Sequence, residues 1–139
     1  MELDYNIEEM VRNVYWDRDM NCANTILECL SAVFDVQIDD QLRKAVVGLH
    51  GAGGYRAQCG LVEGMLLFIG LYADLRGKES DEAVGLCYLF AQCFEEKYGS
   101  LRCYDLRPGG FSPSDPPHAC EALTVEAAKF GVGFIKENF

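Results

Sequence analysis

Along most of this chain, apolar residues recur at spacings of three and four, which is the periodicity of amphipathic helices. Strand-like alternation is weak throughout, and the sequence contains no internal repeat and no low-complexity tract. The pattern predicts helices over Ile7–Asp17, Met20–Phe34, Gln41–Leu49, Gln58–Ala73 and Ser80–Lys97, and a last helix from Pro117 to the C-terminus. Each apolar stripe needs a partner that covers it, so we expect an all-α, single-domain bundle of five to six short helices over residues 1–139.

Polar residues and a glycine mark several predicted helix ends. Asp19 is expected to cap the second helix and Asp39 or Asp40 the third, while Ser80 opens the fifth. Gly99 suits the position just after the fifth helix. On that helix the pattern places five side chains in the core: Val84, Cys87, Phe90, Ala91 and Phe94.

The stretch from His50 to Gly64 contains five glycines around one cysteine, Cys59. Glycine is used where the backbone takes a positive φ or comes close to another group, so the stretch predicts a shaped loop that leads into a buried helix. It matches no phosphate-binding motif, because no strand precedes the glycines and no Lys-Ser/Thr pair follows them. The loop is either a tight connection between helices or one wall of a site. In the second case three glycines are candidates for contact with a cofactor: Gly53, Gly54 and Gly60.

Composition indicates one globular domain, since half of the 139 residues are apolar and about a quarter are charged. The formal net charge of −10 disfavours nucleic acid and anionic membrane surfaces as partners. The apolar run from Leu61 to Tyr72 is interrupted by Glu63 and is too short to cross a bilayer. The first residues lack the basic start and apolar core of a secretory signal, so we expect a cytoplasmic protein.

Seven cysteines are present, and in a reducing cytoplasm they favour metal binding or catalytic thiol chemistry over structural disulfides. Three of them lie inside predicted helices and are expected to pack in the core: Cys29, Cys87 and Cys93. Cys22, Cys59 and Cys120 fall at or near predicted helix starts, where N–H groups and the helix dipole stabilise a thiolate. Cys103 lies in the segment 100–117, which holds all four prolines and is expected to be irregular. No two of these four have Cys-x-x-Cys spacing, so the fold must assemble any shared site.

The two histidines lie close to these cysteines in the sequence. His50 opens the glycine stretch, and His118 lies two residues before Cys120. Histidine can hydrogen bond to a thiolate or ligate a metal ion, so both are candidate site residues. Glu63 falls one helical turn after Cys59 and is either a proton acceptor or a solvated surface residue.

The segment Cys59-Gly60-Leu61-Val62-Glu63-Gly64 resembles the CGAxxG motif of the C_GCAxxG_C_C family of redox-active proteins. The similarity extends to the family's first cysteine segment, its glycine-rich approach and its last two cysteines, which correspond here to Asn21-Cys22-Ala23, Gly51-Ala52-Gly53-Gly54, Cys103 and Cys120. Leu61 departs from the motif, which has alanine there. The resemblance implies redox activity, with an iron–sulfur or other metal centre as an alternative, and it selects the same four cysteines as the helix-start argument.

Three functions remain open. The first is thiol–disulfide or electron-transfer chemistry as a thiol–disulfide oxidoreductase, in which Cys59 attacks and Cys22, Cys103 or Cys120 resolves; its partner is a redox protein or a small thiol or disulfide. The second is binding without catalysis, in which the four cysteines, with His50 or His118, hold zinc or an iron–sulfur cluster. The third is a helical interaction module that pairs as a homodimer or with another protein through the apolar stretch Leu66–Tyr72.

Overall fold

The chain forms an all-α structure, which confirms the fold class predicted from the periodicity. The structure is a computed structural model that describes residues 6–18, 20–106 and 121–139. In chain order its elements are α1 (Ile7–Arg12), η1 (Asn13–Asp17), α2 (Cys22–Val33), α3 (Asp40–Ala45), η2 (Val46–Gly48), α4 (Gly51–Gly54), α5 (Gly60–Leu75), α6 (Ser80–Tyr98), α7 (Cys103–Leu106) and α8 (Glu121–Asn138). Among the described residues no strand forms, and an isolated antiparallel bridge joins Gln58 to Arg102.

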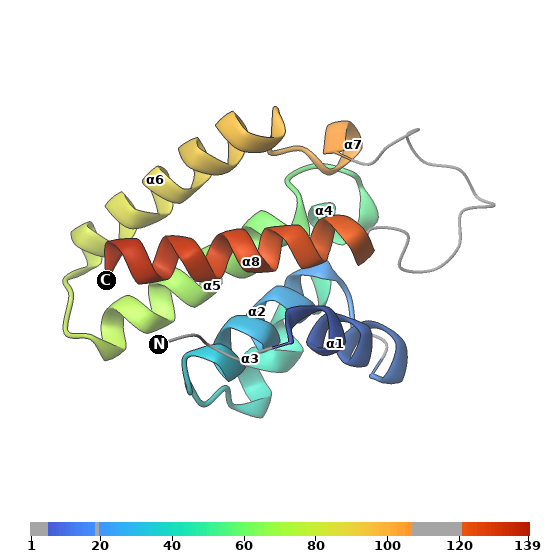
Figure 1. The fold of residues 1–139 in the computed structure, drawn as a ribbon. Coiled ribbons are helices and arrows are strands. Elements are labelled where there is room, and N and C mark those ends of the chain that lie inside the picture. The colour runs from blue at the N-terminus through green and yellow to red at the C-terminus, as the bar shows by residue number, and fades with distance from the viewer. Residues whose placement is uncertain (1–5, 19, 107–120) are drawn as a thin grey trace.

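Helix α5 is the centre of the fold, because α2, α6 and α8 all pack against it. Figure 1 shows α8 crossing in front of α5, with α6 on one side and α1 and α2 on the other. A helix with several packed neighbours must be apolar on several faces, and α5 has this composition. Its fully buried side chains include Leu61, Val62, Met65, Phe68 and Ile69.

Aromatic side chains join α6 to α8. Phe90 and Phe94 of α6 are fully buried, as predicted, and the ring of Phe90 packs edge-on against Phe134 at a centroid distance of 5.3 Å. The core position predicted for Val84 is wrong, since this side chain is 66% exposed. The reason is that α6 meets its neighbours through the narrow face that carries Phe90 and Phe94.

The first predicted helix changes its geometry midway. Helix α1 ends at Arg12, and the chain continues as a π-helix, η1. Such π-turns are rare and occur frequently at functional sites. The π-turn carries Val14 and Tyr15 into the interior, where Tyr15 is only 1% exposed.

The cap predicted for α3 is confirmed. The Asp39 carboxylate accepts the N–H of Leu42 at 2.9 Å. The helix is shorter than predicted, because the chain tightens after Ala45 into the 3₁₀-turn η2. Gly99, with a φ of 88°, ends α6 as expected.

The cap of α2 differs from the prediction, whereas the predicted start of the next long helix after α5 is confirmed. Helix α2 is capped by Asn21 rather than Asp19, because the Asn21 amide oxygen accepts an N–H of the first turn at 2.9 Å. Helix α6 begins at Ser80, as predicted, and the preceding residue caps it, since Glu79 and Glu82 form a reciprocal capping box. In both cases the side chain that reaches the first-turn N–H groups decides where the helix begins.

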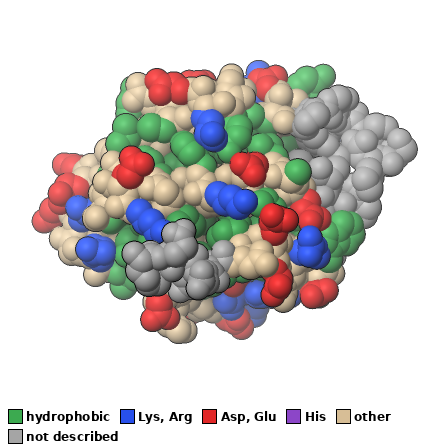
Figure 2. Space-filling model, viewed as in Figure 1, with side chains coloured by type: hydrophobic (Ala, Val, Ile, Leu, Met, Phe, Trp, Pro, Cys, Tyr) green, Lys and Arg blue, Asp and Glu red, His purple; other side chains and the backbone are tan. Residues whose placement is uncertain are grey.

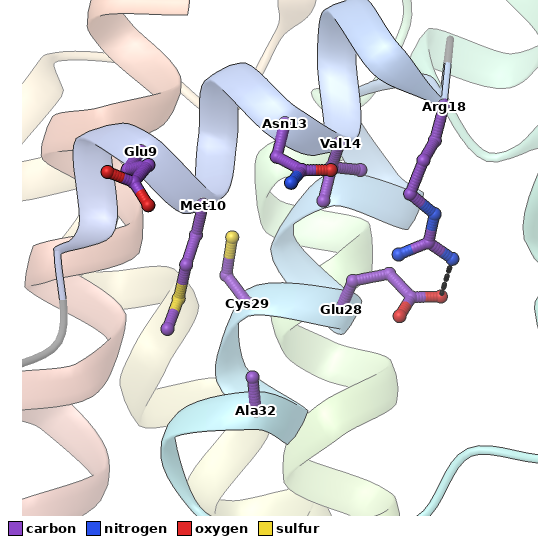
Figure 3. Close-up of a pocket in the computed structure, with 8 residues that line it drawn as sticks. All are labelled: Glu9, Met10, Asn13, Val14, Arg18, Glu28, Cys29 and Ala32. Carbon is purple, nitrogen blue, oxygen red and sulfur yellow. Dashed lines mark ion pairs between the residues drawn. The ribbon is translucent and has the colours of Figure 1, made fainter.

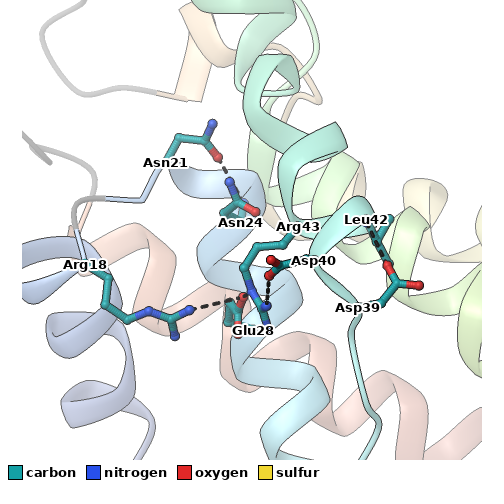
Figure 4. Close-up of polar contacts among 8 residues, drawn as sticks. All are labelled: Arg18, Asn21, Asn24, Glu28, Asp39, Asp40, Leu42 and Arg43. Carbon is teal, nitrogen blue, oxygen red and sulfur yellow. Dashed lines mark hydrogen bonds and ion pairs between the residues drawn. The ribbon is translucent and has the colours of Figure 1, made fainter.

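An ion-pair network ties the middle of α2 to the elements on either side of it in the chain (Figure 4). The Glu28 carboxylate pairs with Arg18 at 3.5 Å and with Arg43 of α3, which also pairs with Asp40 at 3.3 Å. The Glu28 side chain is only 12% exposed, so two guanidinium groups compensate a largely buried charge.

The surface carries charges of both signs. On the face drawn in Figure 2, acidic and basic side chains are interspersed, and hydrophobic side chains show between α6 and α8. Acidic residues outnumber basic ones by 22 to 12 in the sequence, so the long-range field is negative. Within the described residues, no helix combines the length and the apolar character needed to span a bilayer.

Candidate functional site

Two of the predicted site cysteines lie together at the starts of α2 and α5. Cys22 is the first residue of α2, and Cys59 is the N-cap residue of α5. At Gly60, which follows Cys59, an added Cβ would lie 3.0 Å from the Cβ of Cys22. The fold therefore brings Cys22 and the Cys59–Gly60 segment into contact.

Two glycines of the motif allow this close approach. At Gly64, one turn after Gly60, an added Cβ would lie 2.5 Å from the carbonyl oxygen of Ala23. A side chain at either glycine would push α5 away from α2. Helix packing thus accounts for Gly60, and its predicted contact with a cofactor stays a prediction. Leu61, which replaces the alanine of the motif, is 1% exposed and belongs to the core, and α5 still lies against α2 at Gly60 and Gly64.

Cys103 is tied to the Cys59 segment by two backbone hydrogen bonds. The N–H of Cys59 donates to the carbonyl of Leu101 at 2.8 Å, and the N–H of Cys103 donates to the carbonyl of Ala57 at 2.7 Å. These bonds flank the isolated antiparallel bridge, so Cys59 and Cys103 occupy diagonal positions in the pairing. Three of the four predicted cysteines therefore belong to one region of the fold.

The glycine stretch before Cys59 forms a tight turn, α4, in which four successive residues have positive φ values between 57° and 83°. Glycine adopts this conformation without steric cost, which explains three of the four residues. Gly51 is also buried, and an added Cβ there would lie 3.4 Å from the Cβ of Cys103. Gly53 and Gly54 are exposed, with nothing within 4 Å of an added Cβ, so their contact with a cofactor stays a prediction.

His50 lies beside the start of α2, where Asn21 holds it. The Asn21 side-chain nitrogen lies 3.1 Å from His50 Nδ1 and donates to the carbonyl of Val47 at 2.8 Å. The oxygen of the same amide caps α2. An added Cβ at Gly60 would lie 3.1 Å from the Cα of His50, so this histidine belongs to the same region as Cys22.

A hydroxyl that sequence reasoning missed contacts the sulfur of Cys22. The Tyr15 hydroxyl donates to Cys22 Sγ at 3.2 Å and lies 2.5 Å from Thr124 Oγ1 of α8. Tyr15 is 1% exposed and Thr124 is 0% exposed, so their contact lies in the interior, whereas Cys22 is half-buried. The signal in the sequence was a tyrosine within an apolar stripe. Such a tyrosine is expected to be buried, and a buried tyrosine hydroxyl needs a polar partner. The identity of that partner depends on the packing of α8.

Glu63 is engaged by a neighbour of Cys59. The side-chain nitrogen of Gln58 donates to the Glu63 carboxylate at 2.5 Å. This bond links the residue before Cys59 to the first turn of α5, where a negative charge is favoured by the helix dipole. Glu63 is half-buried and therefore only partly solvated, and its role as a proton acceptor stays a prediction.

The other described cysteines are separate from this region. Cys29, Cys87 and Cys93 carry free thiols. Cys29 is 1% exposed, which confirms its core position, whereas Cys87 and Cys93 are half-buried. Burial, with a smaller effect from Glu28, raises the pKa of Cys29 to about 12, and burial also raises the pKa of Cys87. Both thiols are therefore protonated at neutral pH and are poor nucleophiles.

Cys29 lines a pocket of about 260 Å³ between α1, η1 and α2 (Figure 3). Its other lining residues are Glu9, Met10, Asn13, Val14, Arg18, Glu28 and Ala32. None of the residues predicted for the site lines this pocket. It does not form part of the candidate site.

A second pocket, of about 740 Å³, opens beside the pairing that holds Cys59 and Cys103. Its lining includes both residues of the isolated bridge, Gln58 and Arg102, together with Arg56, Glu95 and Asp105. Basic and acidic side chains thus share the lining. A concave surface lined by charged side chains therefore lies next to the cysteine region.

The metal hypothesis requires several ligands around one point. In the part of the chain that the structure describes, no group of three or more His, Cys, Asp or Glu residues is placed to hold a metal ion. Two of the six predicted ligands, Cys120 and His118, lie outside the described residues. Cys22, Cys59, Cys103 and His50 alone therefore do not make the predicted centre.

Comparisons with known proteins agree with the resemblance in the motif. No curated protein and no solved structure matches the chain. The sequence model of the family described as "Putative redox-active protein (C_GCAxxG_C_C)" matches residues 20–132. The matched range contains Cys22, Cys59, Cys103 and Cys120. Because this match covers most of the chain, the protein belongs to the C_GCAxxG_C_C family.

Proposed function

We propose that this protein is a thiol–disulfide oxidoreductase in which Cys22 is the attacking thiolate and Cys59 or Cys103 supplies the second thiol. One observation carries the proposal: Cys22 begins α2, receives a hydrogen bond from a buried hydroxyl, and contacts the segment that contains Cys59. A helix start and a hydroxyl donor both stabilise a thiolate, which is the form of cysteine that attacks disulfides.

Exposure favours Cys22 over Cys59 as the sulfur that a substrate reaches first. Cys59 is 5% exposed, whereas Cys22 is half-buried. An attacking sulfur must meet the substrate disulfide in line, whereas a resolving sulfur needs to reach only its neighbour within the protein. This assigns the attack to Cys22, in place of the Cys59 favoured by the sequence, and leaves Cys59 suited to resolution.

The proposed reaction transfers two electrons. The Cys22 thiolate attacks one sulfur of a partner's disulfide, which forms a mixed disulfide and releases the other sulfur as a thiolate. A second cysteine of this chain then loses its proton and attacks the Cys22 sulfur, which releases the partner's remaining sulfur. The partner ends as a dithiol and this chain holds an intramolecular disulfide; a dithiol reductant returns it to the starting state by the same exchange.

Cys120 remains a candidate for the second thiol on sequence grounds, although it lies outside the described residues. Three resolving cysteines are therefore compared in parallel: Cys59, Cys103 and Cys120. In each serine variant, Cys22 is expected to react with a disulfide, but only the variant that lacks the resolving thiol accumulates the mixed disulfide. Intact-protein mass spectrometry measures this adduct directly.

A single-turnover experiment tests the attack itself. Fully reduced protein is mixed with an aromatic disulfide, and release of the coloured thiolate is followed by absorbance. The native protein and the matched control Cys93→Ser are expected to give a fast phase, and Cys22→Ser is expected to lose it. Retention of the fast phase in Cys22→Ser, at unchanged rate and amplitude, would contradict the proposed function.

A further inference from the structure

Three side chains from separate elements form a hydrogen-bonded row that runs from the interior to the half-buried Cys22. Thr124 of α8 contacts the Tyr15 hydroxyl at 2.5 Å, and the Tyr15 hydroxyl donates to Cys22 Sγ at 3.2 Å. Both hydroxyls lie in side chains that are at most 1% exposed. In a region that excludes water, hydrogen bonds of this kind are stronger than at the surface.

The direction of the row follows from the number of protons. The Cys22 thiolate has no proton to donate, so the single proton of the Tyr15 hydroxyl is directed at sulfur in this form. The bond between Tyr15 and Thr124 must then use the threonine proton, with the Tyr15 oxygen as acceptor. The row therefore runs from Thr124 through Tyr15 to Cys22, and Thr124 keeps the Tyr15 proton aimed at the sulfur.

We propose that Tyr15 is a positioning residue for the redox chemistry of Cys22, and that Thr124 sets the direction of its hydrogen bond. The inference rests on the proposed function, because the bond matters for exchange only if Cys22 is the attacking sulfur. A thiolate accepts hydrogen bonds more strongly than a thiol does, so the Tyr15 hydroxyl favours the charged form of Cys22. The role of the π-turn η1 is thus to place the Tyr15 hydroxyl against the Cys22 sulfur.

Other charged or titratable groups lie on elements near the start of α2: Arg18, His50, Cys59, Glu63 and Glu121. Four of these groups have described partners of their own. Arg18 pairs with Glu28, His50 contacts Asn21, Glu63 accepts from Gln58, and Glu121 accepts from Trp16. Tyr15 is the side chain whose described hydrogen bond goes to the Cys22 sulfur itself.

The test measures alkylation of Cys22 against pH in the full-length reduced protein, with each cysteine quantified by peptide mass spectrometry. Loss of a hydrogen bond to a charged acceptor reduces the thiolate fraction by about tenfold below the midpoint. The remaining thiolate becomes about threefold more nucleophilic, because nucleophilicity rises with basicity. Below the midpoint of the profile Tyr15→Phe is therefore expected to react about threefold more slowly, and at the alkaline plateau about threefold faster, so its profile crosses that of the native protein.

Companion variants separate this role from general loosening of the fold. Thr124→Val is expected to shift the profile in the same direction, and Thr124→Ser, which keeps the hydroxyl, to restore it. Tyr98→Phe is the matched control, because the Tyr98 hydroxyl is buried and has no hydrogen-bond partner among the described residues; its Cys22 profile should equal that of the native protein. His50→Gln shows whether His50 contributes to the profile.

The outcomes distinguish this inference from the proposed function. A Tyr15→Phe profile that coincides with the native one, or differs by a constant factor at every pH, would overturn the role of Tyr15. That result leaves the proposed function standing if Cys22→Ser still loses the fast phase. Urea denaturation of each variant confirms that it is folded, and if Tyr15→Phe is unfolded, the comparison of Thr124→Val with Thr124→Ser decides the question.

Discussion

The backbone of Gly64 lies directly against the backbone of Ala23: a Cβ on the glycine would sit 2.5 Å from the Ala23 carbonyl oxygen. Real Cβ atoms do not approach a carbonyl oxygen this closely, so Gly64→Ala must separate α5 from α2. We expect the variant to lose about 2 to 3 kcal/mol of unfolding free energy. Urea denaturation measures the loss.

Gly70 provides the control for this prediction within the same helix. It is exposed, and nothing lies within 4 Å of an added Cβ. Gly70→Ala should therefore stabilise the protein by roughly 0.5 to 1 kcal/mol through helix propensity alone. Equal effects of the two substitutions would show that α2 and α5 are not in close contact at Gly64.

The oxygen and the nitrogen of the Asn21 side-chain amide make separate contributions to stability. Asn21→Ala removes both the cap of α2 and the hydrogen bond to Val47, and is expected to cost about 2 kcal/mol. Asn21→Ser keeps an oxygen that can cap the helix and should cost only about 1 kcal/mol. Urea midpoints of the two variants test the difference, and identical losses would contradict the assigned role of the side-chain nitrogen.

Cys29 should make the protein sensitive to alkaline pH. Burial, with a smaller effect from Glu28, raises its pKa from 9.0 to about 12. The folded state thus retains a proton that the unfolded state loses, so the stabilising effect is complete below pH 9 and falls as pH rises towards 12. Stability is expected to fall by about 1.4 kcal/mol per pH unit above 9 through this one group.

The variant Cys29→Ala isolates that contribution. At pH 7.5 it should be about 1 kcal/mol less stable than the native protein, because a buried sulfur is removed. Urea denaturation at pH 7.5, 9 and 10, with reductant present, should show the two stabilities approaching each other at pH 9 and crossing by about pH 10. Stabilities that remain parallel across this range would mean that Cys29 ionises freely in the folded protein.

Tyr98 carries a buried hydroxyl that has no hydrogen-bond partner among the described residues. Its ring packs against Phe94 with centroids 4.6 Å apart, and burial, followed by Glu126, raises the pKa of the phenol. Tyr98→Phe keeps the ring contact and removes the unsatisfied group, so it should stabilise the protein by about 1 kcal/mol. A loss of thermal stability would show that the hydroxyl has a partner after all.

The helical periodicity predicted the fold class and most of the long helices because each helix carries its apolar face in its own sequence. Asp39 and Gly99 were also predictable, since caps depend on residues within one turn. The exposed Val84 was not, because a helix stripe shows which side is apolar and not how much of it a neighbour covers. The cap at Asn21 was not predicted, because the pattern placed the helix start at Met20 and the helix begins at Cys22.

The site was predicted less completely, for a physical reason. Cys22 and Cys59 could be selected because each lies at the start of a predicted helix. Their proximity depends on two glycines that let α5 approach α2, and the Tyr15 contact depends on Thr124, which is 109 residues away in the chain. Local patterns identify reactive residue types, while long-range packing decides which of them meet.

Disulfide mapping tests the central claim most directly. The fully reduced protein is treated with one equivalent of a small disulfide, quenched in acid, and analysed by peptide mass spectrometry without reduction. Our account predicts one dominant intramolecular disulfide that contains Cys22 and joins it to Cys59, Cys103 or Cys120, while Cys29, Cys87 and Cys93 remain thiols. A product in which Cys22 stays reduced while other cysteines are oxidised would contradict the account.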